Sequence, residues 1–189
     1  RDPLWSRGLG DVYKRQRFRS TDLSALTARI CDIYADVAAD AGHTLTFDTD
    51  SALQVSGDPD LLTQMMANLI ENAINHAPAP ARIAVTLRGL ADGSVLWRIE
   101  DDGPGIPEAE RGNVFRRLYR LNSSRSTPGN GLGLSMVAAI ADLHRATVRL
   151  DDAAPGLRVS LCFDGLVDED GGAGRNPLAV DDGNIGKAG

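Results

Sequence analysis

Three short blocks of polar and glycine residues, placed among predicted helices and strands, constrain the fold of this chain most strongly. The first is the pair Asn68 and Asn72, the second is the turn 101–107 (DDGPGIP), and the third is the run 129–134 (GNGLGL). Each block alone is weak evidence. Together they supply an amide that suits a metal ion, a carboxylate that suits adenine and a glycine turn that suits phosphates, which are the parts of an ATP site.

Composition sets the frame for these blocks. The 189 residues suit one domain, and a hydrophobic content of 42% is enough for a core. The formal charge of −6 argues against a nucleic-acid partner. Cys31 and Cys162 lie in apolar surroundings, so we expect two buried thiols in a reducing compartment. No apolar run approaches the roughly 20 residues that cross a bilayer, and we expect a soluble piece of a longer protein.

The helical patterns lie in a predicted domain that covers residues 19–165. Residues 1–18 have no sustained period and resemble translated sequencing-adapter read-through, so we interpret them as non-native or disordered; the glycine-rich, acidic residues 166–189 are predicted to be disordered. A helix is predicted from apolar residues at helical spacing between Leu23 and Val37, with Thr21 or Asp22 as its cap. A second begins with Asp58 as the cap and Pro59 in the first position, and it ends before Pro78.

The strand patterns predict a sheet. Apolar residues alternate over 83–87 and 95–99 around a turn at 91–93, and two closing strands flank the turn 154–156. Shorter extended pieces are predicted at 44–47 and 54–56, a long irregular stretch at 106–129, and a helix at 132–143. We therefore predict an α+β fold: a two-layer α/β sandwich whose mixed, mostly antiparallel sheet of about five strands carries about three helices on one face.

The asparagine pair lies on one helical face. Asn68 and Asn72 are four residues apart, so their amides project about one turn from each other. An asparagine oxygen is a neutral, hard ligand that suits Mg²⁺ beside phosphate oxygens. Asn75 and His76 extend this face, and we expect His76 at a nucleotide pocket or at the surface. The alternative is that all four are simply polar positions on an amphipathic helix.

The other two blocks offer a base site and a phosphate site. Asp101 ends a predicted strand, and its carboxylate matches the amino group of adenine but not the carbonyl of guanine. Gly103 and Gly105 would let a flat base approach the main chain, although an ordinary turn after a strand explains them too. The run 129–133 precedes a helix, so its N–H groups could face phosphates; it matches neither a dinucleotide fingerprint nor a Walker loop.

A basic segment lies between the last two blocks. Residues 115–120 (FRRLYR) are too polar to form core, and loops as long as the surrounding stretch are commonly functional lids or disordered. Arg117 and Arg120 could neutralise phosphate charge if this segment closes over a nucleotide. A solvated basic helix is the equally weighted alternative.

In this order, the blocks and the basic segment resemble the N, G1, F and G2 boxes of the catalytic ATP-binding domain of sensor histidine kinases. That family lies in the wider gyrase, chaperone, histidine kinase and mismatch-repair ATPase superfamily, and the resemblance implies its Bergerat-type ATP-binding fold. It covers about residues 20–164, including 21–23 (TDL), 57–59 (GDP) and His144 after the last helix.

The resemblance implies ATP and Mg²⁺ as cofactors, with Asn72 as the Mg²⁺ ligand and Asn68 as a second catalytic asparagine beside the phosphates. It implies that Asp101 holds the adenine amino group and that residues 115–120 form part of a lid over ATP. The full set of implied nucleotide contacts is Asn68, Asn72, Asn75, His76, Asp101, Gly103, Gly105, Ile106, Phe115, Arg117, Arg120, Gly129, Gly131, Leu132 and Gly133.

The implied reaction is transfer of the ATP γ-phosphoryl group to a histidine on a dimerisation domain outside this sequence. The implied partners are that domain and a response regulator, in a full-length homodimer anchored in the plasma membrane. The chain departs from the family at Asn75, where Lys or Arg is common, and His43, His76 and His144 lack the expected acceptor context. We predict that this chain binds Mg-ATP without phosphorylating itself.

Asn68 also bears on the branch of the superfamily. In the hydrolytic ATPases and anti-sigma serine kinases of the superfamily that this chain resembles, the corresponding position is a glutamate used as base, whereas the Asn68 amide takes no proton from water. Glu71 is close in sequence, but its helical phase is about 80° from the mean direction of the two asparagines. This favours a kinase. The alternatives are a hydrolytic ATPase or serine kinase of the same superfamily, and a degenerate nucleotide-binding module that docks a partner without catalysis.

Overall fold

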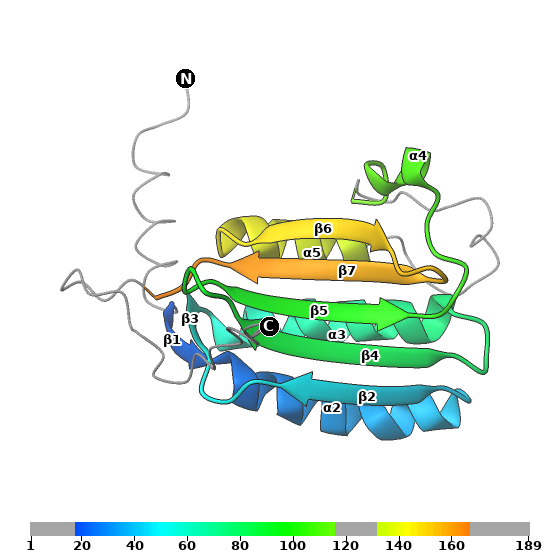
Figure 1. Cartoon of the computed structure of the whole chain (residues 1–189), viewed down its shortest axis with the longest axis horizontal. Helices are drawn as coiled ribbons and strands as arrows, with labels where there is room; N and C mark the ends of the chain where they lie inside the picture. The colour runs from blue at the N-terminus through cyan, green and yellow to red at the C-terminus, as the bar shows by residue number, and fades with distance from the viewer. Residues whose placement is uncertain (1–17, 116–131, 167–189) are drawn as a thin grey trace, which may run out of the picture.

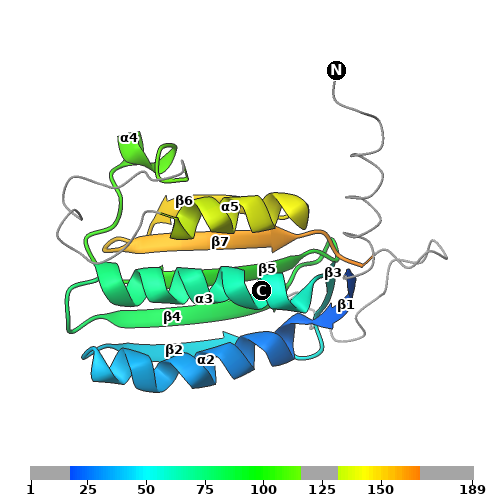
Figure 2. The same cartoon turned by 180° about the vertical axis from the view of Figure 1, so that it is seen from behind.

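The computed structural model describes residues 18–115 and 132–166, and these form two layers. A twisted sheet makes one layer, and α2, α3 and α5 cover one of its faces (Figures 1 and 2). In chain order the elements are β1 (Arg19–Asp22), α2 (Leu23–Asp40), β2 (Thr44–Thr49), β3 (Gln54–Gly57), α3 (Pro59–His76), β4 (Arg82–Gly89), β5 (Val95–Asp101), α4 (Glu108–Arg111), α5 (Gly133–Leu143), β6 (Thr147–Asp152) and β7 (Leu157–Phe163).

The main sheet has five strands in the order β2-β4-β5-β7-β6. Only β2 and β4 run parallel; the other three pairings are antiparallel. The predicted fold class, a mixed and mostly antiparallel sheet with helices on one face, is therefore confirmed. The topology also sets the location of the second block, because the central strand β5 ends at Asp101 with Ile83 of β4 beside it.

Both long helices begin where the sequence predicts. The Asp22 carboxylate caps α2 by accepting from the N–H three residues on, at 2.9 Å. Asp58 caps α3 by accepting from the N–H of Asp60 at 2.9 Å, and Pro59 takes the first helical position, where its missing N–H removes no hydrogen bond. The end of α3 at His76, before Pro78, is confirmed as well.

The core lies between the helices and the inward face of the sheet. Alternate residues of β4 and β5 are buried, as the period of two predicts. Cys31 is buried in this core, and the loss of hydration, with a smaller contribution from Asp32, raises the pKa of its thiol to about 12. Cys162 is only half-buried on β7, so the expectation of two buried thiols is wrong for it. The largest fully buried side chains are Trp97, Phe163, Leu23, Leu62, Met65, Met66, Leu69, Ile70, Ile83, Leu87, Leu161 and Val55.

Two elements were not predicted. β1 pairs antiparallel with β3 in a separate two-stranded sheet. β1 has only four residues, which is too few for an alternating pattern to predict a strand. The stretch predicted to be irregular from residue 106 contains the one-turn helix α4. The domain bounds 19–165 stay a prediction, and the segments 1–17 and 167–189 lie outside the described residues. No described helix has both the length and the apolar character needed to cross a membrane.

Candidate nucleotide-binding site

The asparagines of α3 face the first turns of α5. The Nδ2 of Asn68 lies 3.4 Å from the sulfur of Met136. A Cβ added to Gly133 would lie 3.4 Å from both the Nδ2 and the Oδ1 of Asn72, so the backbone of the third block rests against the Asn72 amide. The cap residue Leu132 makes no side-chain hydrogen bond to the N–H groups that open α5. The first and third blocks therefore meet between two antiparallel helices.

The nitrogen of the Asn72 amide calls for an explanation. Within residues 18–115 and 132–166, its Nδ2 is buried and has no hydrogen-bond partner. A buried polar group without a partner costs about 1–3 kcal/mol, so such groups call for an explanation. The amide borders the glycine backbone of the third block, which makes a polar ligand between α3 and α5 the simplest explanation.

Asp101 is held by backbone donors from two segments. Its Oδ1 accepts from the N–H of Gly103 at 2.9 Å and from the N–H of Leu157 at 3.4 Å. Burial raises the pKa of the carboxyl group above its ordinary value; the two backbone hydrogen bonds and nearby His76 oppose this rise, and Asp102 adds to it. Both hydrogen bonds described for Asp101 go to the same oxygen. The other oxygen is suited to an amino donor in a partly dehydrated setting.

The Asp101 turn lies on the end of α3. A Cβ on Gly103 would come within 3.1 Å of the Cα and Cβ of Ala77, the residue that caps α3. The last turns of α3 are therefore bordered by Gly133 at Asn72 and by Gly103 at Ala77. All three blocks share one place in the fold, which is the condition for a single nucleotide to contact all of them.

Sequence reasoning missed Gly156, in the turn between β6 and β7. Its φ is +106°, and a Cβ there would lie 1.6 Å from the carbonyl oxygen of Asp101. Gly105, with φ +69°, packs back onto Gly156: its Cβ would lie 2.8 Å from the Gly156 oxygen. The local sequence predicts a turn at residues 154–156. It does not predict that this turn packs against the Asp101 backbone, or that the N–H of Leu157 donates a hydrogen bond to the Asp101 carboxylate.

Apart from Phe115, the remaining predicted residues fall into three groups. Asn75 and His76 are exposed on the last turn of α3, next to the convergence point. Ile106 is half-buried after the Asp101 turn, and its carbonyl accepts from the Nε of Arg111 at 2.9 Å. The others lie outside the described residues, so the structure does not place them: Arg117, Arg120, Gly129 and Gly131.

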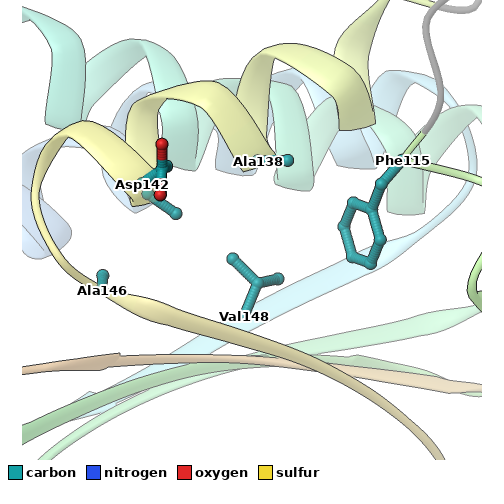
Figure 3. A pocket seen from close by; sticks show the side chains of 6 residues that line it. Phe115, Ala138, Asp142, Ala146 and Val148 are labelled. Carbon is teal, nitrogen blue, oxygen red and sulfur yellow. The ribbon is translucent and has the colours of Figure 1, made fainter.

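Phe115 is not brought to the asparagines. Its ring lies beside a hollow of about 280 Å³ between α5 and β6, whose other walls include Ala138, Asp142 and Val148 (Figure 3). Ala138 is two residues beyond Met136, which is about 200° around the helix. Because Met136 contacts Asn68, the hollow and Phe115 lie on the far side of α5 from the asparagine pair.

Two of the histidines have structural bonds. The His144 Nε2 accepts from the N–H of Asp58 at 3.1 Å while its Nδ1 lies 2.7 Å from the oxygen of Ile140, which ties the end of α5 to the start of α3. Burial lowers the pKa of His144, so the neutral ring that can accept this bond is favoured. His43 is also buried and accepts from the N–H of Ala81 at 3.2 Å. Both rings thus hold backbone in place.

The family described as "Histidine kinase-, DNA gyrase B-, and HSP90-like ATPase" matches residues 57–166, and the chain belongs to this family. The resemblance found in the sequence is thereby confirmed, and ATP is the nucleotide that membership implies. The chain is 40% identical over 105 residues to the signal transduction histidine-protein kinase/phosphatase MprB of Mycobacterium leprae, and 37% over 115 residues to MprB of Mycolicibacterium smegmatis. The matches cover 56% and 60% of this chain, but only 20% and 23% of those relatives.

Solved structures of histidine kinase domains show the same fold. A mycobacterial sensor histidine kinase MprB superposes with a TM-score of 0.68 at 29% identity, covering 77% of this chain and 96% of that one. The ATP-binding domain of PrrB from Mycobacterium tuberculosis gives 0.62 at 26% identity, covering 80% and 99%. The catalytic domain of histidine kinase ThkA, at 22% identity and a TM-score of 0.69 over 77% of this chain and 96% of that one, supports the fold alone.

Proposed function

We propose that this chain is the ATP-binding catalytic domain of a sensor histidine kinase, which positions Mg-ATP for transfer of the γ-phosphoryl group to a histidine. The observation that carries the proposal is the meeting of three blocks around one end of α3. Gly133 rests on Asn72, Gly103 rests on Ala77, and Asp101 lies beside this contact with one carboxylate oxygen tied to the backbone.

The donor set fits a magnesium-bound nucleotide. The Nδ2 of Asn72 is buried without a hydrogen-bond partner among the described residues, and an amide oxygen is a ligand that Mg²⁺ accepts beside phosphate oxygens. When bound, Mg²⁺ supplies charge neutralisation for the phosphates. Asp101 accepts a hydrogen bond from the adenine amino group, and the N–H groups that open α5 donate to the phosphates.

Two features favour transfer over hydrolysis. Asn68 is an amide and takes no proton from an attacking water. The nearest carboxylate on α3, Glu71, accepts a hydrogen bond from the hydroxyl of Tyr34 on α2. Burial, and then this contact with Glu71, raises the pKa of Tyr34 to about 12, so the hydroxyl stays a donor. Glu71 is therefore held toward α2 by this hydrogen bond. No described carboxylate on α3 is placed to act as a base beside Asn68.

The partners follow from the same proposal. The acceptor histidine lies on a dimerisation domain of the full-length protein, a response regulator receives the phosphoryl group, and the full-length protein is a membrane-anchored homodimer with this domain in the cytoplasm. The support is the similarity to MprB proteins, of which the chain spans about a fifth. A nucleic-acid partner is not part of the proposal, because the chain carries a formal charge of −6.

Binding of a fluorescent ATP analogue with Mg²⁺ tests the proposal. We expect Asp101→Asn to weaken binding by about 10–100-fold, since a hydrogen bond to a charged group contributes about 1.5–3 kcal/mol. Asp102→Asn is the matched control: this neighbour is exposed, and among the described residues its side chain accepts from the N–H of Arg82, which an amide oxygen also does. Equal binding by both variants would contradict the role of Asp101 and favour a module without a nucleotide.

Incubation with γ-labelled ATP distinguishes a histidine kinase domain from a hydrolytic ATPase of the same superfamily. We expect neither acid-labile label on the chain nor substantial release of inorganic phosphate. Rapid phosphate release would favour a hydrolytic ATPase. Label on the chain would contradict the prediction that it does not phosphorylate itself.

A further inference from the structure

Met136 differs from the other methionines of this chain in its exposure. The sequence holds three methionines. Met65 and Met66, on the inward face of α3, are completely buried, whereas Met136 on α5 is 36% exposed. A thioether reacts with an oxidant only where the oxidant reaches the sulfur, so the fold leaves one methionine open to modification and protects two.

Met136 is also in contact with the candidate site. The Nδ2 of Asn68 lies 3.4 Å from its sulfur. A thioether carries no hydrogen, so it can only accept, and the contact therefore turns the NH₂ side of the Asn68 amide toward α5. The carbonyl side of the same planar amide then points away from α5. Met136 is thus a positioning residue for Asn68.

We propose that Met136 is an oxidation site through which a peroxide changes nucleotide binding. The sulfur lone pair attacks one oxygen of hydrogen peroxide, the O–O bond breaks, and an S–O bond forms. The sulfur is oxidised by two electrons to the sulfoxide. The departing hydroxide takes the remaining proton and leaves as water. The product is polar and chiral where the thioether was flexible and apolar, and methionine sulfoxide reductases reverse it.

The consequence for the site follows from the contact with Asn68 and rests on the nucleotide-binding role proposed above. A sulfoxide oxygen is a stronger acceptor than a thioether and lies one bond farther from the chain, so it holds the Asn68 amide more firmly and crowds the contact between α3 and α5. Both effects restrict the movement of the Asn68 side chain that brings its amide into contact with a phosphate. Oxidation is expected to weaken Mg-ATP binding about threefold to tenfold.

The test uses the purified chain treated with hydrogen peroxide. Peptide mass mapping is expected to find the added oxygen on Met136 and not on Met65 or Met66. The side-chain amide resonance of Asn68 in an ¹⁵N NMR spectrum is expected to shift on oxidation and to return after treatment with a sulfoxide reductase. These two readouts need no nucleotide, so they test the inference even if the nucleotide role proves wrong.

The binding arm compares the wild type with Met136→Leu, which keeps the apolar volume but has no sulfur. Wild-type affinity for a fluorescent ATP analogue is expected to fall on oxidation, and Met136→Leu is expected to bind equally before and after peroxide. A loss of affinity that persists in Met136→Leu would place the effect on another group, such as the half-buried Cys162, and overturn the proposal. Equal oxidation of all three methionines, or an unmoved Asn68 resonance, would overturn it too. Failure of the untreated wild type to bind nucleotide would contradict the proposed function instead.

Discussion

The two ends of the candidate site are held in very different ways. At the Asp101 end, one carboxylate oxygen accepts from two backbone N–H groups, and a glycine with φ +106° packs directly behind the strand. At the asparagine end, the Asn72 amide has a buried nitrogen without a partner in the described part of the chain, and Asn68 makes one weak contact to a sulfur.

This difference shows which part of the site the fold builds in advance. The Asp101 end is fixed by backbone from two segments, so it is rigid without a ligand. The asparagine end keeps a polar group unsatisfied, which costs stability and is sustained where function requires it. We therefore expect substitutions of the glycines that support Asp101 to act first on folding and substitutions at the asparagines to act first on binding.

Gly156→Ala is expected to have the largest effect. A Cβ would lie 1.6 Å from the Asp101 oxygen, and the positive φ disfavours any side chain. Strain and overpacking each contribute about 1–3 kcal/mol, so the free energy of unfolding should fall by roughly 3 kcal/mol or more. Urea unfolding measures this. Gly93→Ala, with φ +84° but no atom within 4 Å, isolates the cost of the dihedral angle alone. Equal losses in both variants would contradict the packing argument.

Asn72→Ala should produce the opposite pattern. It removes a buried nitrogen that has no partner among residues 18–115 and 132–166, so stability in urea should hold or rise. Binding of Mg-ATP should weaken about 10–100-fold and lose most of its dependence on Mg²⁺, because a ligand is gone. Titrations with and without Mg²⁺ check this. Gln64→Ala, about two turns earlier on an exposed position of α3, serves as the control. An unchanged Mg²⁺ dependence in Asn72→Ala would remove Asn72 as the ligand.

Asp101→Asn should change the pH dependence of stability. Burial raises the pKa of Asp101 in the folded state, so the folded protein binds the proton more tightly than the unfolded chain. The stability that protonated Asp101 contributes is therefore fully present below about pH 4, and it is lost as pH rises through the raised pKa. The amide variant keeps an acceptor for both backbone donors and has no such decline, so it should be the more stable protein at neutral pH. Unfolding curves of the wild type and of Asp101→Asn between about pH 3 and pH 7 measure this difference in pH dependence. Parallel stability profiles for the two proteins would contradict the prediction.

Asn75→Lys is expected to have the smallest effect. The new cation would lie on the last turn of α3, near the asparagine pair, at an exposed position where a charge contributes up to about 1 kcal/mol. Affinity for Mg-ATP should rise by a few fold and the gain should shrink at high salt. Asn75→Gln controls for side-chain length. An equal gain in that control, or none in the lysine variant, would separate Asn75 from the phosphates.

The sequence predicted the parts of this comparison that depend on local pattern. The cap at Asp58, the strand that ends at Asp101 and the helix that begins at Gly133 all follow from residues close in the chain. The support behind Asp101 does not. Gly156 reaches Asp101 through the pairing of β5 with β7, across 55 residues of chain, and a backbone contact of this kind leaves no periodic signal.

Two further features were out of reach of the sequence for related reasons. The location of Phe115 depends on which side of α5 the chain passes after α4, and nothing in a run of basic residues specifies that. The contact between Asn68 and Met136 depends on the rotation of α3 relative to α5, which is set by packing in the core. Motifs therefore identified the chemistry, while tertiary packing decided which end of the site is rigid.

An NMR titration of the ¹⁵N-labelled chain with Mg-ATP tests the central idea most directly, because it watches both ends of the site at once. If one nucleotide spans them, the Gly103 amide, the Asn72 side-chain amide and the Gly133 amide should shift together and fit a single dissociation constant. Shifts at only one end, or separate constants for the two ends, would show that these groups do not share a ligand.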